Sequence, residues 1–308
     1  MAIVAGGLDL GGTKIEAQLF DGQWQSTHRQ RWPTPKDYND LVAAMRDAVA
    51  WCQAHGGMDL PVGVSAAGRI NPKTGLTIAA NLAASNRPFP ADVETATHRP
   101  ITWINDCLAL ALSEWRFGAA KGADPAVAII FGTGLSGGVI VQGQIMPSFS
   151  SLGGEIGHGP LPAGPMLCHG LPLLSCGCGR TGCAETLLSA PGLARIAANV
   201  LGPLAGENLS AEAVIAGKAA RAEFQKAWDI WLELASDFLI SLCFAVDPAV
   251  IVLGGGLSNA KGITEDLSRH LQRATLKGFA SPPIRLAQGG DSSGARGAAY
   301  AAWQKCQP

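Results

Sequence analysis

The most specific chemical feature of the chain is a group of closely spaced cysteines. Cys176, Cys178 and Cys183 stand among glycines, two and then five residues apart. Three thiolates at this spacing can surround one metal ion, and His158 upstream is a candidate fourth ligand, which gives the Cys₃His set of a closed structural zinc site. Reduced, buried thiols are the alternative interpretation, and two more side chains compete as ligands: Cys168 and His169.

Three glycine-rich segments have the composition of phosphate-binding turns: Asp9–Lys14 (Asp-Leu-Gly-Gly-Thr-Lys), Gly132–Gly138 and Gly254–Gly256. Glycines let backbone N–H groups approach an anion with no Cβ in the way. A strand is expected after the first segment, and the chain has no G-x-x-x-x-G-K-[ST] run, which excludes the dinucleotide fingerprint and the P-loop. The first segment alone also fits an ordinary glycine hairpin, and the third alone fits a common connection between a strand and a helix. The second segment favours phosphate binding, because phosphate is often held between two such turns.

Asp106 is a candidate general base. It stands where an apolar strand at 101–104 meets a helix, and ligands of open α/β sheets bind at the carboxyl ends of strands. A carboxylate there could take a proton from a sugar hydroxyl, while Mg²⁺ and backbone dipoles neutralise phosphate charge. The alternative is that Asp106 merely caps the helix.

Two glutamates flank the cysteine group. Glu155 precedes His158 in the run Glu-Ile-Gly-His, and Glu185 follows Cys183 by two residues. A glutamate in a loop is usually solvated. Fixed beside a metal site, these two become candidates for recognising hydroxyl groups.

The elements that must position these groups alternate between strands and helices. Strands are expected at 3–4, 8–10, 15–19, 61–64, 101–104, 127–131, 139–141 and 250–253. Helices are expected at 37–54, 107–117, 185–200, 210–245 and 293–304, with one more opening at Gly254–Gly256. Residues 147–183 have no periodicity and read as a long functional loop.

An internal repeat of layout points to two domains. Strand, glycine turn and strand follow one another in residues 1–20 and again in 127–141, and a chain of 308 residues is long enough for two domains. The expected lobes are residues 1–117 with 293–308, and residues 118–292.

Composition excludes several classes of protein. With 23 Lys and Arg against 24 Asp and Glu, the net charge is -1, so electrostatics gives no reason to bind nucleic acid or an anionic membrane. A hydrophobic content of 47% excludes intrinsic disorder. The start of the chain has no signal-peptide pattern, and the long uncharged stretch 125–154 is broken by glycines. A cytoplasmic location is expected.

In this order the elements resemble the ROK family of sugar kinases and repressors, over nearly the whole chain from Asp9 to Ala299. The resemblance implies an α/β actin/hexokinase-like fold with two RNase H-like lobes, an interdomain cleft that holds ATP, and a sugar at its base. It also implies Mg²⁺ and a structural Zn²⁺ as cofactors, a small sugar as the substrate, and the homodimer common in the family.

The resemblance further implies roles for individual residues. Asp106 is the catalytic base. The sugar-binding residues are Gly68, Arg69, Asn81, Asn105, Glu155, His158 and Glu185. The ATP-binding residues are Asp9, Gly11, Gly12, Thr13, Lys14, Gly132, Thr133, Gly134, Gly254, Gly255 and Gly256. The zinc ligands are His158, Cys176, Cys178 and Cys183, so the zinc would fix the loop that presents the sugar ligands.

Several segments favour N-acetylated hexosamines as substrates. Residues 76–85, 254–259 and the insertion 161–174 resemble bacterial N-acetylglucosamine kinases. Residues 65–72 instead look like the sugar loop of N-acetylmannosamine kinases and depart from the Gly-x-Pro-Gly usual in glucokinases. The sequence therefore predicts ATP-dependent phosphorylation of the 6-hydroxyl of N-acetylglucosamine, with N-acetylmannosamine second. The alternatives are a glucokinase or fructokinase, and a sugar-sensing repressor, for which Asp9 leaves no room for a preceding helix-turn-helix.

Overall fold

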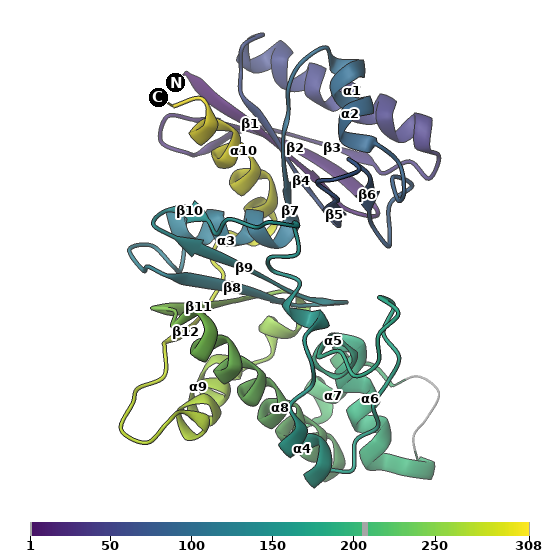
Figure 1. Cartoon of the computed structure of the whole chain (residues 1–308), viewed down its shortest axis with the longest axis vertical. Helices are drawn as coiled ribbons and strands as arrows, with labels where there is room; N and C mark the ends of the chain where they lie inside the picture. The colour runs from purple at the N-terminus through teal and green to yellow at the C-terminus, as the bar shows by residue number, and fades with distance from the viewer. Residues whose placement is uncertain (1, 205–208, 308) are drawn as a thin grey trace. The chain divides into compact units, whose positions relative to one another are not determined.

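The computed structural model describes residues 2–204 and 209–307, which form two compact units (Figure 1). Unit 1 consists of residues 1–118, 143–153 and 288–308, and unit 2 of residues 119–142 and 154–287. Gly118 and residues 143–153 and 288–292 thus belong to unit 1, whereas the boundaries expected from the sequence place them in the second lobe. No helix among the described residues has both the length and the apolar character needed to cross a membrane.

Unit 1 is built on a five-stranded sheet of order β3-β2-β1-β4-β7. Three strands form an antiparallel meander, and two more run parallel to β1. The strands are β1 (Ile3–Leu10), β2 (Lys14–Asp21), β3 (Ser26–Pro33), β4 (Val62–Ala66) and β7 (Thr102–Asn105). Since β1, β4 and β7 are parallel, their carboxyl ends lie at one edge of the sheet.

Helices cover both faces of this sheet (Figure 1). They are α1 (Tyr38–Gly56), α2 (Phe89–Thr97), α3 (Asp106–Phe117) and α10 (Ser293–Lys305), with a 3₁₀ turn, η4 (Gly290–Ser292), before α10. Adjacent glycines on β1 face opposite sides: a Cβ on Gly6 would meet Cys52 of α1, and one on Gly7 would strike the backbone of Ala295 in α10. The missing side chain at Gly7 therefore lets α10 pack directly on the sheet.

A short hairpin extends from the end of β4 in unit 1. It consists of β5 (Arg69–Ile70) and β6 (Thr77–Ile78). The segment 143–153, which contains β10 (Gln144–Ile145), belongs to the same unit.

Unit 2 repeats the strand plan of unit 1. Its strands follow the order β9-β8-β11-β12, in which β8 and β9 are antiparallel and β11 is parallel to β8 and β12. They are β8 (Ala126–Phe131), β9 (Leu135–Val141), β11 (Val250–Gly254) and β12 (Ile284–Leu286). A hairpin followed by parallel strands in both units confirms the predicted repeat.

Helices of unit 2 pack around one long central helix, α8 (Ala222–Val246). Its fully buried Trp228 and Trp231 stack with ring centroids 5.1 Å apart, and Trp231 also packs edge-on against Phe131 of β8. The other helices are α4 (Ala163–Cys168), α5 (Glu185–Leu188), α6 (Ala190–Leu201), α7 (Ala211–Gly217) and α9 (Ile263–Ala274), with 3₁₀ turns η1 (Ile156–His158), η2 (Gly202–Leu204) and η3 (Gly256–Asn259).

Several predicted boundaries are wrong for local reasons. Gly137 and Gly138 lie within β9 rather than in the turn, and a Cβ on Gly137 would come within 2.5 Å of Ile156, which packs against the strand. The predicted helix 185–200 is two helices, because Ser189 caps a second one with its hydroxyl. Residues 147–183 contain η1 and α4 and are not one loop.

Two predicted helices also differ from the structure, at a polar segment and at the third glycine segment. The predicted helix 210–245 divides into α7 and α8 around residues 218–221. The third glycine segment opens only a 3₁₀ turn, and α9 begins at Ile263. Strand β3 was not predicted, because its exposed, polar residues do not alternate with apolar ones.

Candidate active site and metal centre

The first glycine segment forms the turn between β1 and β2 in unit 1. Gly11 N donates to Lys14 O at 3.0 Å and closes the turn. Thr34 Oγ1 donates to Gly11 O, and Lys36 Nζ donates to Gly12 O, both at 2.8 Å. Thr34 and Lys36 were not anticipated, because they lie more than twenty residues from the turn and belong to no motif.

Asp9, at the carboxyl end of β1, is an aspartate in an unfavourable environment. Burial raises its pKa to about 6, the Ser65 side chain opposes this, and the negative charge of Asp106 adds to the rise. A Cβ on Gly294 of α10 would lie 2.5 Å from Asp9 Oδ1, so the helix covers this carboxylate closely. Asp9 and Asp106 therefore form an electrostatically coupled pair of carboxylates at one edge of the sheet.

Asn105 and Asp106 stand where β7 becomes α3. Asn105 caps the helix: its Oδ1 accepts from Cys107 N at 2.9 Å, and its Nδ2 donates to Gly68 O at 3.0 Å. Asp106 is the first residue of the helix, and its Oδ1 also accepts from Cys107 N, at 2.8 Å. Asn105 therefore occupies the N-cap position, and Asp106 accepts from the same N–H from inside the first turn.

Two predicted sugar-binding segments of unit 1 lie against the turns already described. Gly68 has a φ of +114°, and a Cβ there would lie 2.5 Å from Ile78 O, so only glycine fits. Asn81 is exposed, and its Cβ lies 3.1 Å from the position of a Cβ on Gly12. The structure therefore brings Gly68 to Asn105, and Asn81 to the first glycine turn.

The second and third glycine segments adjoin each other in unit 2. Gly132 N donates to Gly134 O at 3.0 Å, which makes a tight turn with the exposed Thr133 at its tip. Gly255 has a φ of +84°, and a Cβ there would strike Phe131 O and lie 3.0 Å from Gly132 N. Glycine at 255 therefore allows the backbone of the third segment to lie against that of the second.

Glu185 joins the second glycine turn to the cysteine group. Its Oε2 accepts from Leu135 N at 2.9 Å, and a Cβ on Gly134 would come within 2.6 Å of the same oxygen. Its Oε1 lies 3.9 Å from Cys176 Sγ. Glu155 Oε2 lies 3.5 Å from His158 Nε2. Both predicted glutamates are therefore held near the predicted metal ligands, within unit 2.

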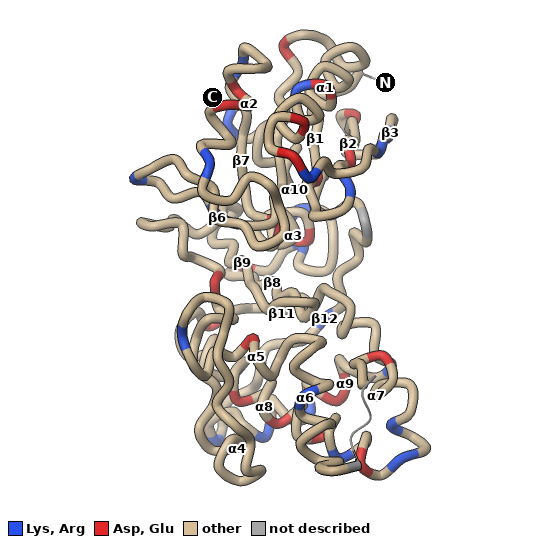
Figure 2. Tube along the Cα trace, turned by 90° about the vertical axis from the view of Figure 1, so that its right-hand side faces the viewer, with Lys and Arg blue, Asp and Glu red and all other residues tan. Residues whose placement is uncertain are grey.

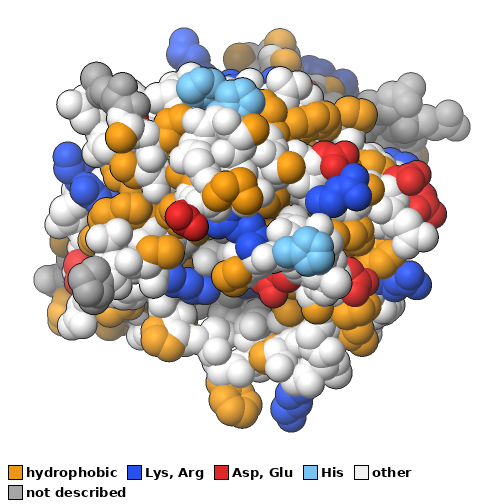
Figure 3. Space-filling view, turned by 90° about the horizontal axis from the view of Figure 1, so that it is seen from above, with side chains coloured by type: hydrophobic (Ala, Val, Ile, Leu, Met, Phe, Trp, Pro, Cys, Tyr) orange, Lys and Arg blue, Asp and Glu red, His pale blue; other side chains and the backbone are white. Residues whose placement is uncertain are grey.

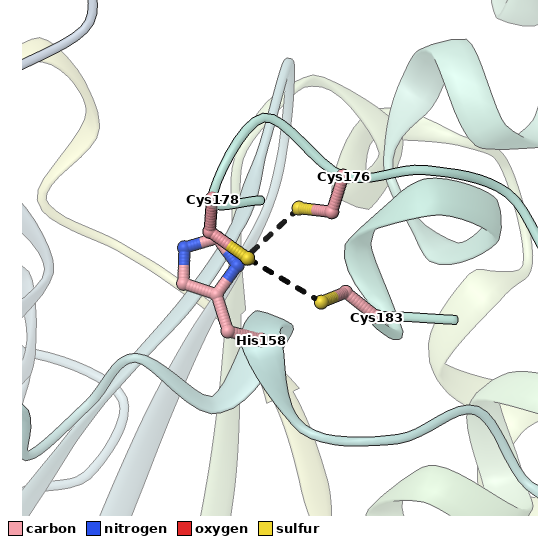
Figure 4. A group of neighbouring side chains, drawn as sticks. All are labelled: His158, Cys176, Cys178 and Cys183. Carbon is pink, nitrogen blue, oxygen red and sulfur yellow. Dashed lines mark hydrogen bonds between the residues drawn. The ribbon is translucent and has the colours of Figure 1, made fainter. Parts of the chain in front are cut away.

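The four predicted metal ligands converge (Figure 4). One ligand atom from each of His158, Cys176, Cys178 and Cys183 lies within 4.8 Å of the others. Neither competing residue joins the group: Cys168 is exposed at the end of α4, and His169 pairs with Glu233 at 2.7 Å.

The chemistry of this donor set fits a zinc ion. Burial and the neighbouring thiols raise the pKa of Cys183 to about 12, so its thiolate needs a compensating cation. The two ring nitrogens of His158 face different partners, because Nδ1 lies 3.6 Å from Cys176 Sγ and Nε2 lies toward Glu155. A carboxylate on the far nitrogen is the usual means of orienting a metal-bound histidine.

Positively and negatively charged residues are interspersed along the chain in both units (Figure 2), and their side chains lie among apolar ones on the face seen in Figure 3. One concentrated group surrounds Glu16, which is buried on β2. Arg29 approaches it to 2.7 Å and Lys14 to 3.7 Å, and Arg31 pairs with it as well. The cations lower the pKa of Glu16, against the effect of its burial, and keep a carboxylate in the sheet beside the first glycine turn.

Comparison with known proteins agrees with this arrangement. Residues 5–305 match the ROK family. The chain is 34% identical to an N-acetylgalactosamine kinase of Shewanella sp. (strain ANA-3), over 95% of this chain and 94% of that one. It is 35% identical to an N-acetyl-D-glucosamine kinase of Escherichia coli O127:H6, over 96% and 97%.

A solved structure also resembles the whole chain. It is a ROK family glucokinase from Streptomyces griseus in complex with glucose and AMPPNP, with a TM-score of 0.76, 28% identity, and coverage of 98% of this chain and 99% of that one. The fold is thus the α/β, actin-like ATPase fold that the sequence predicted. The chain belongs to the ROK family.

The buried carboxylate of Asp9 predicts a pH-dependent stability difference. Its pKa is raised on folding, so the wild-type protein loses stability as the pH rises from about 4 through 6. Asp9→Asn removes this loss. We expect the variant to be more stable by about 3 kcal/mol at pH 7.5, with a smaller difference at pH 5, in urea unfolding with a chelator present.

Asp47→Asn, at an exposed position of α1, is the matched control and should show no such pH-dependent gain. Equal stability of Asp9→Asn and wild type at pH 7.5 would contradict the buried, charged state of Asp9.

Proposed function

We propose that this chain transfers the γ-phosphoryl group of ATP to the 6-hydroxyl of an N-acetylhexosamine. The enzyme class, an ATP-dependent sugar kinase, was predicted from the sequence and is confirmed by the full-length relatives. One observation carries the proposal: Asp106 stands at the carboxyl end of β7, paired electrostatically with Asp9 beside the first glycine turn. A base and an anion-binding turn at one sheet edge are what phosphoryl transfer to an alcohol requires.

Asp106 is assigned the role of general base. Its carboxylate accepts the proton of the attacking hydroxyl, which accounts for roughly 10²–10⁴-fold of the rate. Asn105 supports this role, because its side chain ties the start of α3 to the Gly68 loop. The base is therefore carried by the end of a strand and the start of a helix, both of which are rigid.

The glycine turns are assigned to the nucleotide. Their backbone N–H groups bind phosphate oxygens, and Lys14 adds a positive charge near the first turn. The raised pKa of Asp9 fits a Mg²⁺ site. A divalent cation there would offset the free-energy cost of burying the charged carboxylate and would reduce its repulsion from Asp106. Bound there, Mg²⁺ would neutralise phosphate charge. The assigned residues are Asp9, Gly11, Gly12, Thr13, Lys14, Gly132, Thr133, Gly134, Gly254, Gly255 and Gly256.

Seven residues are assigned to the sugar. Carboxylates accept hydrogen bonds from ring hydroxyls, whereas amide and guanidinium groups donate to ring substituents. The assigned residues are Gly68, Arg69, Asn81, Asn105, Glu155, His158 and Glu185. N-Acetylglucosamine is favoured and N-acetylmannosamine is second. The names of the relatives add N-acetylgalactosamine to the candidates.

The cysteine group is assigned to a structural Zn²⁺ bound by His158, Cys176, Cys178 and Cys183. The convergence of four zinc-type donors supports this assignment. An ion there would fix the 3₁₀ turn that carries His158 and, through Cys176, the surroundings of Glu185. We also propose the homodimer that the family resemblance implies.

The substrate assignment predicts a ranking of sugars. An assay of ADP release should give a higher kcat/KM for N-acetylglucosamine than for glucose, fructose and mannose, with N-acetylmannosamine and N-acetylgalactosamine measured in parallel. NMR of the product should place the phosphate on O6. A kcat/KM for glucose or fructose above that of every N-acetylhexosamine would instead make the chain a glucokinase or fructokinase.

Removing the base tests the mechanism. Asp106→Asn should lower kcat by at least 10²-fold, because the amide cannot accept the hydroxyl proton. Sugar binding, measured by calorimetry, should remain within a few-fold of wild type, since the shape of the side chain is kept. Turnover near the wild-type rate would refute the role of Asp106.

Loss of one thiolate tests the metal site. Cys178→Ser should release zinc and lower the thermal stability of the protein, because structural zinc sites contribute on the order of 10 kcal/mol to folding. Cys168→Ser, an exposed cysteine outside the group, is the control and should keep the metal. Elemental analysis of untreated wild-type protein that finds no zinc would overturn the assignment.

A further inference from the structure

Unit 1 contains a hollow that none of the assigned roles explains. It has a volume of about 380 Å³ and lies between the β5–β6 hairpin and the segment 149–152. Three large apolar side chains on its wall are strongly exposed: Phe149 at 96%, Leu152 at 66% and Ile78 at 57%. Apolar side chains this exposed, gathered at one hollow, are typical of a binding surface.

The hollow is connected to the base by a short chain of contacts. Asn105, the residue before Asp106, holds Gly68 O, and the backbone of Gly68 packs against Ile78 O. Arg69 follows Gly68 and lines the hollow together with Ile78. A ligand positioned against Asn105 and Gly68 therefore has the hollow beside it.

The polar lining of the hollow favours an acceptor group on the ligand. Arg69, Asn71 and Lys73 line it, and no carboxylate is found among its described lining residues. Asn71 Oδ1 already accepts from Lys73 N at 2.9 Å, so the amide offers its N–H donors. A carbonyl oxygen attached to an apolar tail matches both parts of the lining, since the oxygen accepts from these donors and the tail packs on the exposed apolar side chains.

We infer that this hollow receives the N-acyl substituent of the hexosamine and has room for acyl chains longer than acetyl. The inference rests on the proposed function and names the residues that set this part of its specificity. The acyl carbonyl accepts from the polar side, and the alkyl tail packs on Phe149, Leu152 and Ile78. A volume of about 380 Å³ far exceeds the roughly 30 Å³ that one water molecule occupies in the liquid, so a methyl group alone leaves most of the space unused.

A series of acyl chains tests the inference. On the hexosamine epimer that the enzyme prefers, kcat/KM is measured for the N-acetyl, N-propanoyl and N-butanoyl sugars. The wild type should use N-butanoyl at least as well as N-acetyl, since each buried methylene favours binding by up to about fourfold. Phe149→Ala should lower the ratio of N-butanoyl to N-acetyl kcat/KM by about tenfold, and Leu152→Trp, which fills the hollow, should lower it at least as much.

Phe279→Ala is the matched control, because Phe279 is 69% exposed and lies in unit 2 outside the hollow. Its ratio should equal that of the wild type. A wild type that rejects N-butanoyl by more than tenfold, or a Phe149→Ala ratio that shifts no more than the control, would overturn the inference. Failure of the proposed function is distinguishable, because the wild type would then use none of the N-acyl sugars.

Discussion

The burial of Asp9 beside Asp106 is the constraint on which the rest of unit 1 depends. Burial is the main cause of the raised pKa of Asp9, and the negative charge of Asp106 at the same end of the sheet adds to it. Such a pair persists only in a scaffold that holds it in place. Gly7 and Gly63 supply this scaffold, because without side chains they let α10 lie against the backbone of β1 and β4 and cover Asp9. Burying charged carboxylates lowers the stability of the folded protein, and residues that serve a function often have this effect.

Unit 2 meets a different constraint, since its candidate sugar-binding residues lie on irregular backbone. Residues 154–183 contain only short helical turns, which carry little stability of their own. The contacts among His158, the cysteines and Glu185 gather this segment near the second glycine turn. A metal at the four donors would add to the packing that Leu161, Met166 and Leu171 already provide in the core of unit 2. The two units thus hold their polar groups by different means, one by close helix packing and the other by a ligand cluster.

The sequence predicted best where chemistry demands particular residue types at fixed spacing. The cysteine spacing and the glycine turns are local, and the structure brings the four ligand candidates together, although their roles remain predictions. Strand β3 was missed because its residues are mostly polar. The reason for this polarity lies on another strand, since Arg29 and Arg31 pair with the buried Glu16 of β2. The capping by Asn105 was missed because Asp106 is an equally good capping residue by type, and only geometry separates them.

Contacts between distant segments explain what no pattern could reveal. Ser65 affects the pKa of Asp9, and Thr34 fixes the first turn, yet each is an ordinary residue in its own segment. The hollow in unit 1 is the clearest case. Its walls come from residues 69–78 and 149–152, which lie more than seventy positions apart, and Phe149 reads in sequence as an unremarkable loop residue.

The two kinds of recognition surface differ in how strictly they select a sugar. A site built to hydrogen-bond a hydroxyl rejects a sugar that lacks it by 10⁴–10⁵-fold, because its polar groups are then left unpaired, whereas an apolar pocket separates ligands that differ by one methylene only about 10–200-fold. Under the proposed assignments, Glu155, His158 and Glu185 are of the first kind, and the contacts around the cysteines hold them in place. The wall of Phe149, Leu152 and Ile78 is of the second kind. Under these assignments, the choice between N-acetylglucosamine and N-acetylgalactosamine, which differ at one ring hydroxyl, belongs to the carboxylates and histidine, and tolerance of the acyl group belongs to the hollow of unit 1.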